Sequence, residues 1–130
     1  MGRVTYITLY QGWTNSKVCP PNWETKPYGV LFNKNNYTNL KAVYFVAAIS
    51  VNDVTATGKI RLYNVTDGKE IEESTIETNE TSIEFVDMVK KTSNLKDRLP
   101  DHEVALVFQL QVSEGFLIRC TTVYLEVVEE

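Results

Sequence analysis

The segment from Val104 to Val112 constrains the fold more than any other part of the sequence. Apolar residues occupy every second position of VALVFQLQV, and Gln109 and Gln111 fall between them. A period of two places alternate side chains on opposite faces of an extended chain, so the segment predicts a β-strand with one buried and one wetter face. Most of the chain shows similar short runs, separated by turn residues about every 8–12 positions.

These runs predict about eight strands and no helix between them, which indicates an all-β, antiparallel β-sandwich formed by one domain over residues 1–130. Asp67-Gly68 predicts a hairpin turn, and Pro100 closes the one stretch that has room for a helical turn, Lys90–Asp101. Within Ser82–Val86 we expect Ile83 and Phe85 to face inward, and we expect Gly12–Lys26 to be irregular. The expected strands are Val4–Tyr10, Tyr28–Phe32, Ala42–Val51, Lys59–Tyr63, Glu70–Thr75, Ser82–Val86, Val104–Val112 and Phe116–Val127.

Charge and hydropathy exclude several classes of partner. The net charge is −4 and Lys90-Lys91 is the only adjacent basic pair, so we do not expect nucleic-acid binding. The longest apolar run, Ala42–Val51, is about half of a membrane span, so we do not expect membrane insertion. No apolar segment of a signal peptide is visible near the N-terminus. An intracellular protein, a virion component and a piece of a larger secreted protein all fit this pattern.

Two cysteines, Cys19 and Cys120, leave two alternatives open. In many β-sandwiches the first and last strands are neighbours, which would allow a disulfide that closes a loop of about 100 residues and adds up to ~4–5 kcal/mol of stability. Alternatively, both are buried free thiols that pack as small apolar side chains. One pair without a CxxC motif does not form a zinc site.

The segment KIRLYNVTDG, Lys59–Gly68, carries a resemblance to a known class of protein. It resembles the "arLYNvTdg" signature of jelly-roll β-sandwich modules in bacterial extracellular proteins and in phage or viral surface proteins. The segments FQLQ and TVYL are similar to that pattern in order and spacing, and the resemblance extends over roughly Ala42–Val127. It implies a jelly roll with a structural or binding role at a virion or extracellular surface, and self-association, for example as a trimer. It transfers no site residues, because these modules share none.

Aromatic residues in the first third of the chain predict a binding surface. Tyr10, Trp13, Trp23 and Tyr28 lie in or beside the irregular segment, which is too polar to form core. Flat exposed aromatic rings stack on sugar rings and anchor protein interfaces. The alternative is that the tryptophans cap one end of the core.

No catalytic pattern stands out. His102 is the only histidine, and neither Ser113 nor Cys120 has the context of an activated nucleophile. The carboxylates between Glu70 and Asp87 alternate with apolar residues, which indicates the wet side of strands rather than a pair of catalytic acids. We therefore expect no enzymatic activity.

We also expect no cofactor, with one alternative left open. Jelly-roll binding modules often hold a calcium ion in a loop, and the oxygen-rich turns here are Asn52-Asp53 and Asp67-Gly68. Ordinary turn chemistry also explains both turns.

Three N-glycosylation sequons begin at Asn36, Asn64 and Asn79, all in expected turns, which favours an exposed location for the protein. Together these observations predict a self-associating structural or interaction protein. The alternative is a carbohydrate-binding module whose exposed aromatic residues contact glycans.

Overall fold

The computed structural model describes residues 2–130 as an all-β structure with three single helical turns. The strands and turns follow one another in this order: β1 (Arg3–Ser16), β2 (Glu24–Phe32), η1 (Lys34–Asn36), β3 (Leu40–Val51), β4 (Gly58–Asn64), β5 (Lys69–Glu70), β6 (Ile76–Thr78), α1 (Phe85–Met88), β7 (Val89–Lys91), η2 (Lys96–Arg98), β8 (Val104–Val112) and β9 (Ile118–Glu129).

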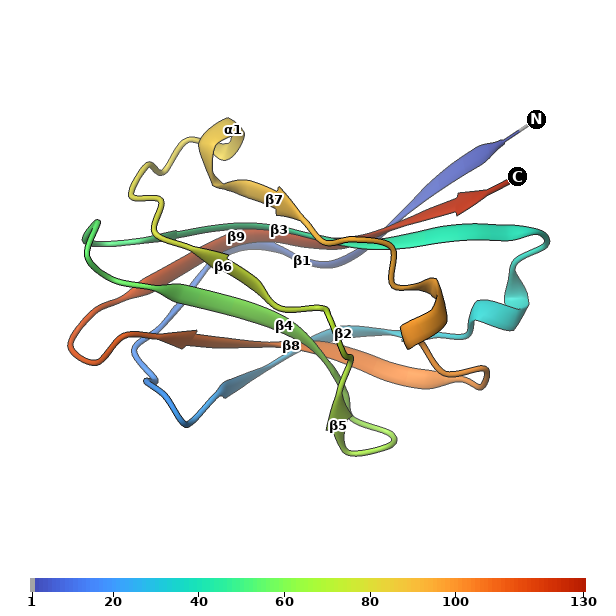
Figure 1. Cartoon of the computed structure of the whole chain (residues 1–130), viewed down its shortest axis with the longest axis horizontal. Helices are drawn as coiled ribbons and strands as arrows, with labels where there is room; N and C mark the ends of the chain where they lie inside the picture. Colours follow the sequence, from blue (N-terminus) through green and yellow to red (C-terminus); the bar gives the residue numbers. More distant parts are fainter. Residues whose placement is uncertain (1) are drawn as a thin grey trace.

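The strands form two antiparallel sheets that pack face to face (Figure 1). Sheet A has the order β1-β9-β3-β7, and sheet B has the order β2-β8-β4-β5, with β6 also paired to β4. The pairs are nested: β1 pairs with β9, β2 with β8, β3 with β7, and β4 with β5. A long hairpin rolled around a core gives this nesting, so the fold is the expected jelly-roll β-sandwich.

The core lies between the sheets and follows the alternation that the sequence predicts. Phe45 of β3, Phe108 of β8 and Leu125 of β9 have no exposed surface. Successive side chains of a strand point to opposite faces, so the residues between them form the outer faces of the sheets. These outer faces carry the surfaces considered below.

The expected strand Ser82–Val86 is wrong. This segment is a loop that leads into α1, and Ile83 and Phe85 are 59% and 50% exposed instead of facing inward. The Glu80 carboxylate accepts hydrogen bonds from the backbone of Thr81 and Ser82, and these bonds turn the chain before a strand can pair. Met88, three residues after Phe85, is the buried residue that anchors α1.

Other boundaries also differ from expectation. β1 continues to Ser16 and β2 begins at Glu24, so the irregular segment is shorter than expected and Trp13 lies within a strand. The expected strand Glu70–Thr75 is reduced to its first residue, because the chain turns at Glu73, whose φ is 66°. The helical turn within Lys90–Asp101 is present as η2, whereas the helical turns η1 and α1 and the strands β6 and β7 were not expected.

The disulfide that the sequence left open is not formed: Cys19 and Cys120 are both free thiols. Cys120 lies on β9 with its side chain in the core, opposite Ile49 of β3. Burial raises the pKa of the Cys120 thiol to about 12. Cys120 therefore packs as an apolar side chain, while Cys19 is only half-buried.

Candidate interaction surfaces

The four aromatic residues expected to form one binding surface lie in three different environments. The rings of Tyr10 of β1 and Tyr28 of β2 pack against each other at a tilt of 37°, with centroids 4.5 Å apart. Both rings also contact Phe108 in the core, at centroid distances of 6.0 and 6.4 Å. This pair therefore closes the side of the sandwich between the two edge strands, although Tyr28 remains 40% exposed.

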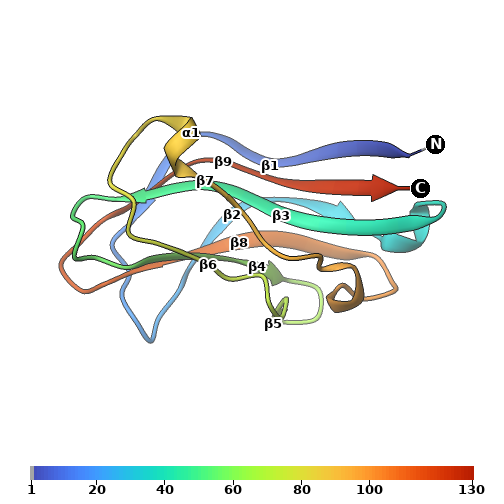
Figure 2. The same cartoon turned by 45° about the horizontal axis from the view of Figure 1, so that its top comes forward.

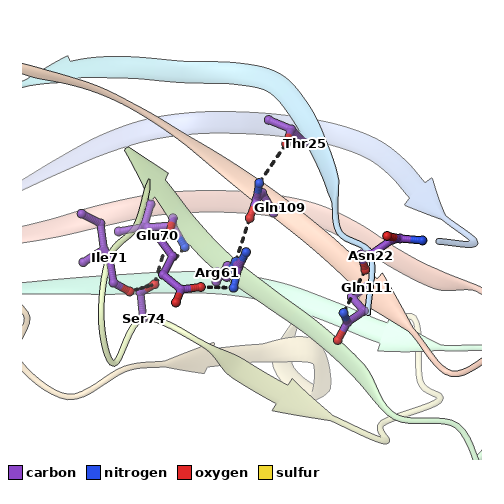
Figure 3. A network of polar contacts seen from close by, with 9 residues as sticks. Asn22, Thr25, Arg61, Glu70, Ile71, Ser74, Gln109 and Gln111 are labelled. Carbon is purple, nitrogen blue, oxygen red and sulfur yellow. Dashed lines mark hydrogen bonds and ion pairs between the residues drawn. The ribbon is translucent and has the colours of Figure 1, made fainter. Parts of the chain in front are cut away.

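Trp23 is held against the outer face of sheet B. The guanidinium carbon of Arg61 lies 4.0 Å from the centre of the indole ring, a cation–π contact. Arg61 Nε donates to Gln109 Oε1 over 2.7 Å, and Gln109 Nε2 donates to Thr25 Oγ1 over 2.9 Å (Figure 3). Arg61 also pairs with Glu70. One face of the indole is thus covered by a side chain whose Nε and Nη1 already bond to Gln109 and Glu70.

Trp13 is the most exposed of the four aromatic residues, at 53%. It lies where the pairing of β1 with β9 is interrupted between Gln11 and Thr14. Gly12 beside it has φ 152°, a value that favours glycine, and the Tyr10 hydroxyl lies 3.0 Å from the position of an added Cβ. The glycine therefore allows the irregularity that carries Trp13 outward.

Two groups of exposed apolar side chains were not anticipated. The first is on β1, where Val4 and Tyr6 are 48% and 62% exposed. The second surrounds α1 and comprises Ile83, Phe85 and Val86. Val4–Tyr10 was expected as a strand, but the sequence does not reveal that this strand lies at the edge of a sheet.

Tyr6 is part of a row of tyrosines on the outer face of sheet A. Its ring meets Tyr124 of β9 edge to face, with centroids 5.7 Å apart. Tyr44 lies on the neighbouring β3. The ammonium group of Lys91, on β7, is 4.5 Å from the centre of the Tyr44 ring and 3.3 Å from a Glu126 oxygen. Sheet A therefore presents an outer face with rings from three adjacent strands and with the ion pair of Lys91 and Glu126.

His102 lies in an exposed turn between Leu99 and Val104. Its Nε2 is 2.9 Å from an Asp67 oxygen, and its Nδ1 is 3.8 Å from an Asp101 oxygen. The Ser113 hydroxyl accepts from the Thr57 backbone N–H, and Cys120 is buried. Neither of the nucleophiles considered from the sequence is therefore recorded in contact with this histidine.

The carboxylates between Glu70 and Asp87 are used by surface ion pairs and turns. Glu70 pairs with Arg61, Glu77 pairs with Lys59, and Glu72 and Glu73 both pair with Arg98. Exposed pairs of this kind contribute little to stability, about 0–1 kcal/mol each.

Both turns considered for calcium use their carboxylates internally. Asp53 accepts from the Thr55 hydroxyl and backbone N–H, and these bonds hold the pKa of Asp53 below its usual value. A hydrogen bond from the Asn64 amide, with a smaller contribution from His102, lowers the pKa of Asp67. Among residues 2–130 we find no cluster of three or more His, Cys, Asp or Glu side chains arranged to hold a metal ion.

The three sequons differ in accessibility. Asn36 and Asn79 are exposed, whereas Asn64 has no exposed surface. The Asn64 side chain donates to the Asp67 carboxylate and accepts from the Asp67 backbone N–H. In the folded chain only Asn36 and Asn79 therefore present a free amide. Over the same described residues, no helix is long and apolar enough to cross a membrane.

No protein-family model matches the chain, and no curated protein matches it. The chain is similar in structure to the infectious bursal disease virus Gt strain structure, with a TM-score of 0.47 and 12% identity, over 98% of this chain and 32% of that one. The VP2 subviral particle of the same virus gives a TM-score of 0.47 and 11% identity, over 99% and 33%. The xylan-binding module CBM15 gives a TM-score of 0.49 and 12% identity, over 97% of both chains.

The chain thus spans about a third of the length of the viral chains and nearly all of the xylan-binding module. At these identities the likenesses concern the course of the backbone alone. The function of this jelly-roll chain therefore has to be argued from its own surface.

Proposed function

We propose that this chain is a non-enzymatic structural or interaction module that self-associates, as a component of a virion or of a cell surface. The observation that carries the proposal is the presence of two groups of exposed apolar side chains on the side formed by sheet A. Val4 and Tyr6 on β1, and the group around α1, all belong to the side of the molecule formed by sheet A. On the sheet B side, Leu31 of β2 and Val65 after β4 are exposed as well.

The outer face of sheet B supports the same proposal by contrast. Arg61 bonds to both Gln109 and Glu70, and Lys59 pairs with Glu77, 3.6 Å away. A polar surface that satisfies itself gains little from a partner. Grouped exposed apolar side chains, in contrast, are typical of surfaces that another molecule covers. We therefore place the contact on the sheet A side, at one of its two groups of exposed apolar side chains.

Light scattering coupled to size exclusion tests this proposal over a range of protein concentrations. We expect the mass to rise with concentration from that of one chain, 14.8 kDa, toward a defined multiple. Apolar contacts are weakly sensitive to ionic strength, so added salt should preserve the assembly. A monomer at every concentration would refute the proposal. The same measurement counts subunits, and a closed trimer stays a prediction until it is made.

A second candidate function is glycan binding through Trp13. Its 53% exposure is the observation that favours this function, because a ring must offer a free face to stack on a sugar. Trp23 provides a matched control, since Arg61 already covers its ring. We expect Trp13→Ala to abolish any binding on a glycan array and Trp23→Ala to change it less. Binding that both variants retain, or no binding by the parent chain, would refute this candidate.

A further inference from the structure

We infer that the N-terminal half of β1, Arg3–Thr8, pairs with the same segment of a second copy, antiparallel across a two-fold axis. Sheet A would then continue from one copy into the other. This inference rests on the proposed self-association and adds the surface, the partner and the symmetry. Hereafter Arg3–Thr8 is called the pairing edge.

The pairing edge is regular and open on one side. Its residues match Glu129–Tyr124 of β9 one by one, without a register shift. On its other side no strand follows, because β1 is the terminal strand of sheet A (Figure 2). Among the described residues, no backbone hydrogen bond of the pairing edge is recorded other than those to β9. Alternate N–H and C=O groups are therefore available to another strand.

The side chains of β1 do not prevent such pairing. After Arg3, β1 carries no charged residue up to its end at Ser16. Val4, Tyr6 and Thr8, which alternate along the edge, are exposed, and their types favour strands. Proteins usually protect an exposed edge with charges, proline, bulges or short strands. Apart from Arg3 at its first position, which pairs with Glu129, the pairing edge has none of these, and the shift between Thr8 and Tyr10 marks where it ends.

The other edge strands of the sandwich carry the protection that β1 lacks. β2 contains Lys26 and Pro27 and has a register shift between Lys26 and Gly29. β7 is three residues long and contains Lys90 and Lys91. β5 is a single Lys-Glu pair. The contrast within one molecule indicates that the edge at β1 is left open for a partner.

A second copy is the partner that the chemistry favours. An antiparallel edge is its own complement, because a two-fold rotation sets its donors against its own acceptors. The chain carries a net charge of −4, so two copies repel each other in general. The pairing edge adds no carboxylate to this repulsion, and its neighbours Glu129 and Glu126 are neutralised by Arg3 and Lys91.

Two exposed substitutions in the full chain test the inference. Tyr6→Lys places a charge on the pairing edge, and Val86→Lys places the same charge on the apolar group at α1, where Val86 is 78% exposed. Because both side chains are exposed, the variants should keep the parent melting temperature and circular dichroism spectrum. Sedimentation equilibrium then measures association. We expect Tyr6→Lys to weaken it by about tenfold or more and Val86→Lys to leave it nearly unchanged.

Hydrogen exchange provides a second readout that does not depend on any variant. Amide exchange in the peptide that contains the pairing edge should slow as the parent concentration rises, while exchange in α1 should not change. Association that survives Tyr6→Lys but is lost in Val86→Lys would overturn the pairing edge and leave the proposed self-association standing. A parent chain that is monomeric at all concentrations would overturn both. If the edge became protected from exchange only when an unrelated extended strand is added, the partner would be a different molecule. That result would overturn the inference that a second copy of this chain binds the edge.

Discussion

The outer faces of the two sheets differ in how far other side chains cover their aromatic rings. On sheet B, the Arg61 guanidinium covers Trp23 and bonds to Gln109 and Glu70, so aromatic and polar groups satisfy one another. On sheet A, Tyr6 is 62% exposed, and its ring meets that of Tyr124 edge to face. The difference teaches that aromatic content alone does not identify an interaction surface. What matters is whether the protein already covers the ring.

The largest expected effect concerns α1, the short helix that packs against β3 of sheet A. Met88 anchors α1 over the outer face of β3 and is fully buried (Figure 1). Met88→Ala should lower the free energy of unfolding by about 2–5 kcal/mol, because a cavity replaces the thioether. Urea denaturation measures this loss. A change below that of an exposed substitution such as Val86→Ala would mean that α1 does not pack on the sheet.

The network on sheet B should give the next largest effect. Arg61→Ala removes the ring contact and leaves Gln109, itself only 6% exposed, without its donor. We expect a loss of about 1–3 kcal/mol in urea denaturation, because hydrogen bonds to charged groups are among the stronger ones. Lys59→Ala, on the same strand, is the control and should cost less, since Lys59 forms only an exposed ion pair. Equal losses would mean that the network contributes nothing beyond surface charge.

The equivalent contact on sheet A should matter less. Lys91 lies over Tyr44 and beside Glu126, but its side chain is 49% exposed. Lys91→Ala should therefore cost about 0.5–1 kcal/mol or less, in the range of exposed cation–π contacts and ion pairs. High salt should reduce this difference further. A loss as large as that of Arg61→Ala would remove the distinction between the two faces.

Lowering the pH should reduce the stability of the chain in part through Asp67, in the turn at the end of sheet B. The pKa of Asp67 is lowered mainly by the Asn64 amide, so the folded chain binds this proton less readily than the unfolded chain. The stability that Asp67 contributes is therefore present above its unfolded pKa and is lost as the pH falls through its folded pKa. Below about pH 4, the melting temperature of the Asp67→Asn variant should therefore fall less steeply with decreasing pH than that of the parent chain. An unchanged acid profile in that variant would contradict the assignment.

The smallest expected effect is that of chelation. Both oxygen-rich turns use their carboxylates in hydrogen bonds, Asp53 with Thr55 and Asp67 with Asn64. We therefore expect EDTA to leave the melting temperature unchanged and added calcium to leave it unchanged as well. A rise with calcium that Asp53→Asn or Asp67→Asn abolishes would establish a site at that turn and make the ion part of the fold.

The sequence was most informative where apolar residues alternate over many positions, although Gln109 and Gln111, which were expected on the wetter face of β8, are buried too. The alternation of Val104–Val112 predicted β8, and the Asp67-Gly68 turn predicted the β4–β5 hairpin. The same alternation gave a wrong prediction at Ile83 and Phe85, because a period of two also occurs in this short loop. Hydrogen bonds to the Glu80 carboxylate hold the loop away from any neighbouring strand. Periodicity reports which side chains share a face, but not whether a neighbouring strand is there to pair.

The candidate surfaces were only partly predictable. Clustering in the sequence suggested that Tyr10, Trp13, Trp23 and Tyr28 act together, yet the fold sends them to different strands and faces. Which ring stays free depends on long-range neighbours such as Arg61, 38 positions after Trp23 in the printed sequence. Likewise, the edge position of β1 follows from the complete strand order, which no local pattern contains.

The contrast between the two thiols has a practical consequence. Cys120 is enclosed in the core, and a pKa of about 12 keeps its sulfur protonated, whereas Cys19 reaches solvent in the segment before Trp23. Because thiolates rather than thiols react with maleimides, a dye or spin label added to the native chain should attach at one place. The molecule thus offers a built-in single-site probe for following association without engineering a new cysteine.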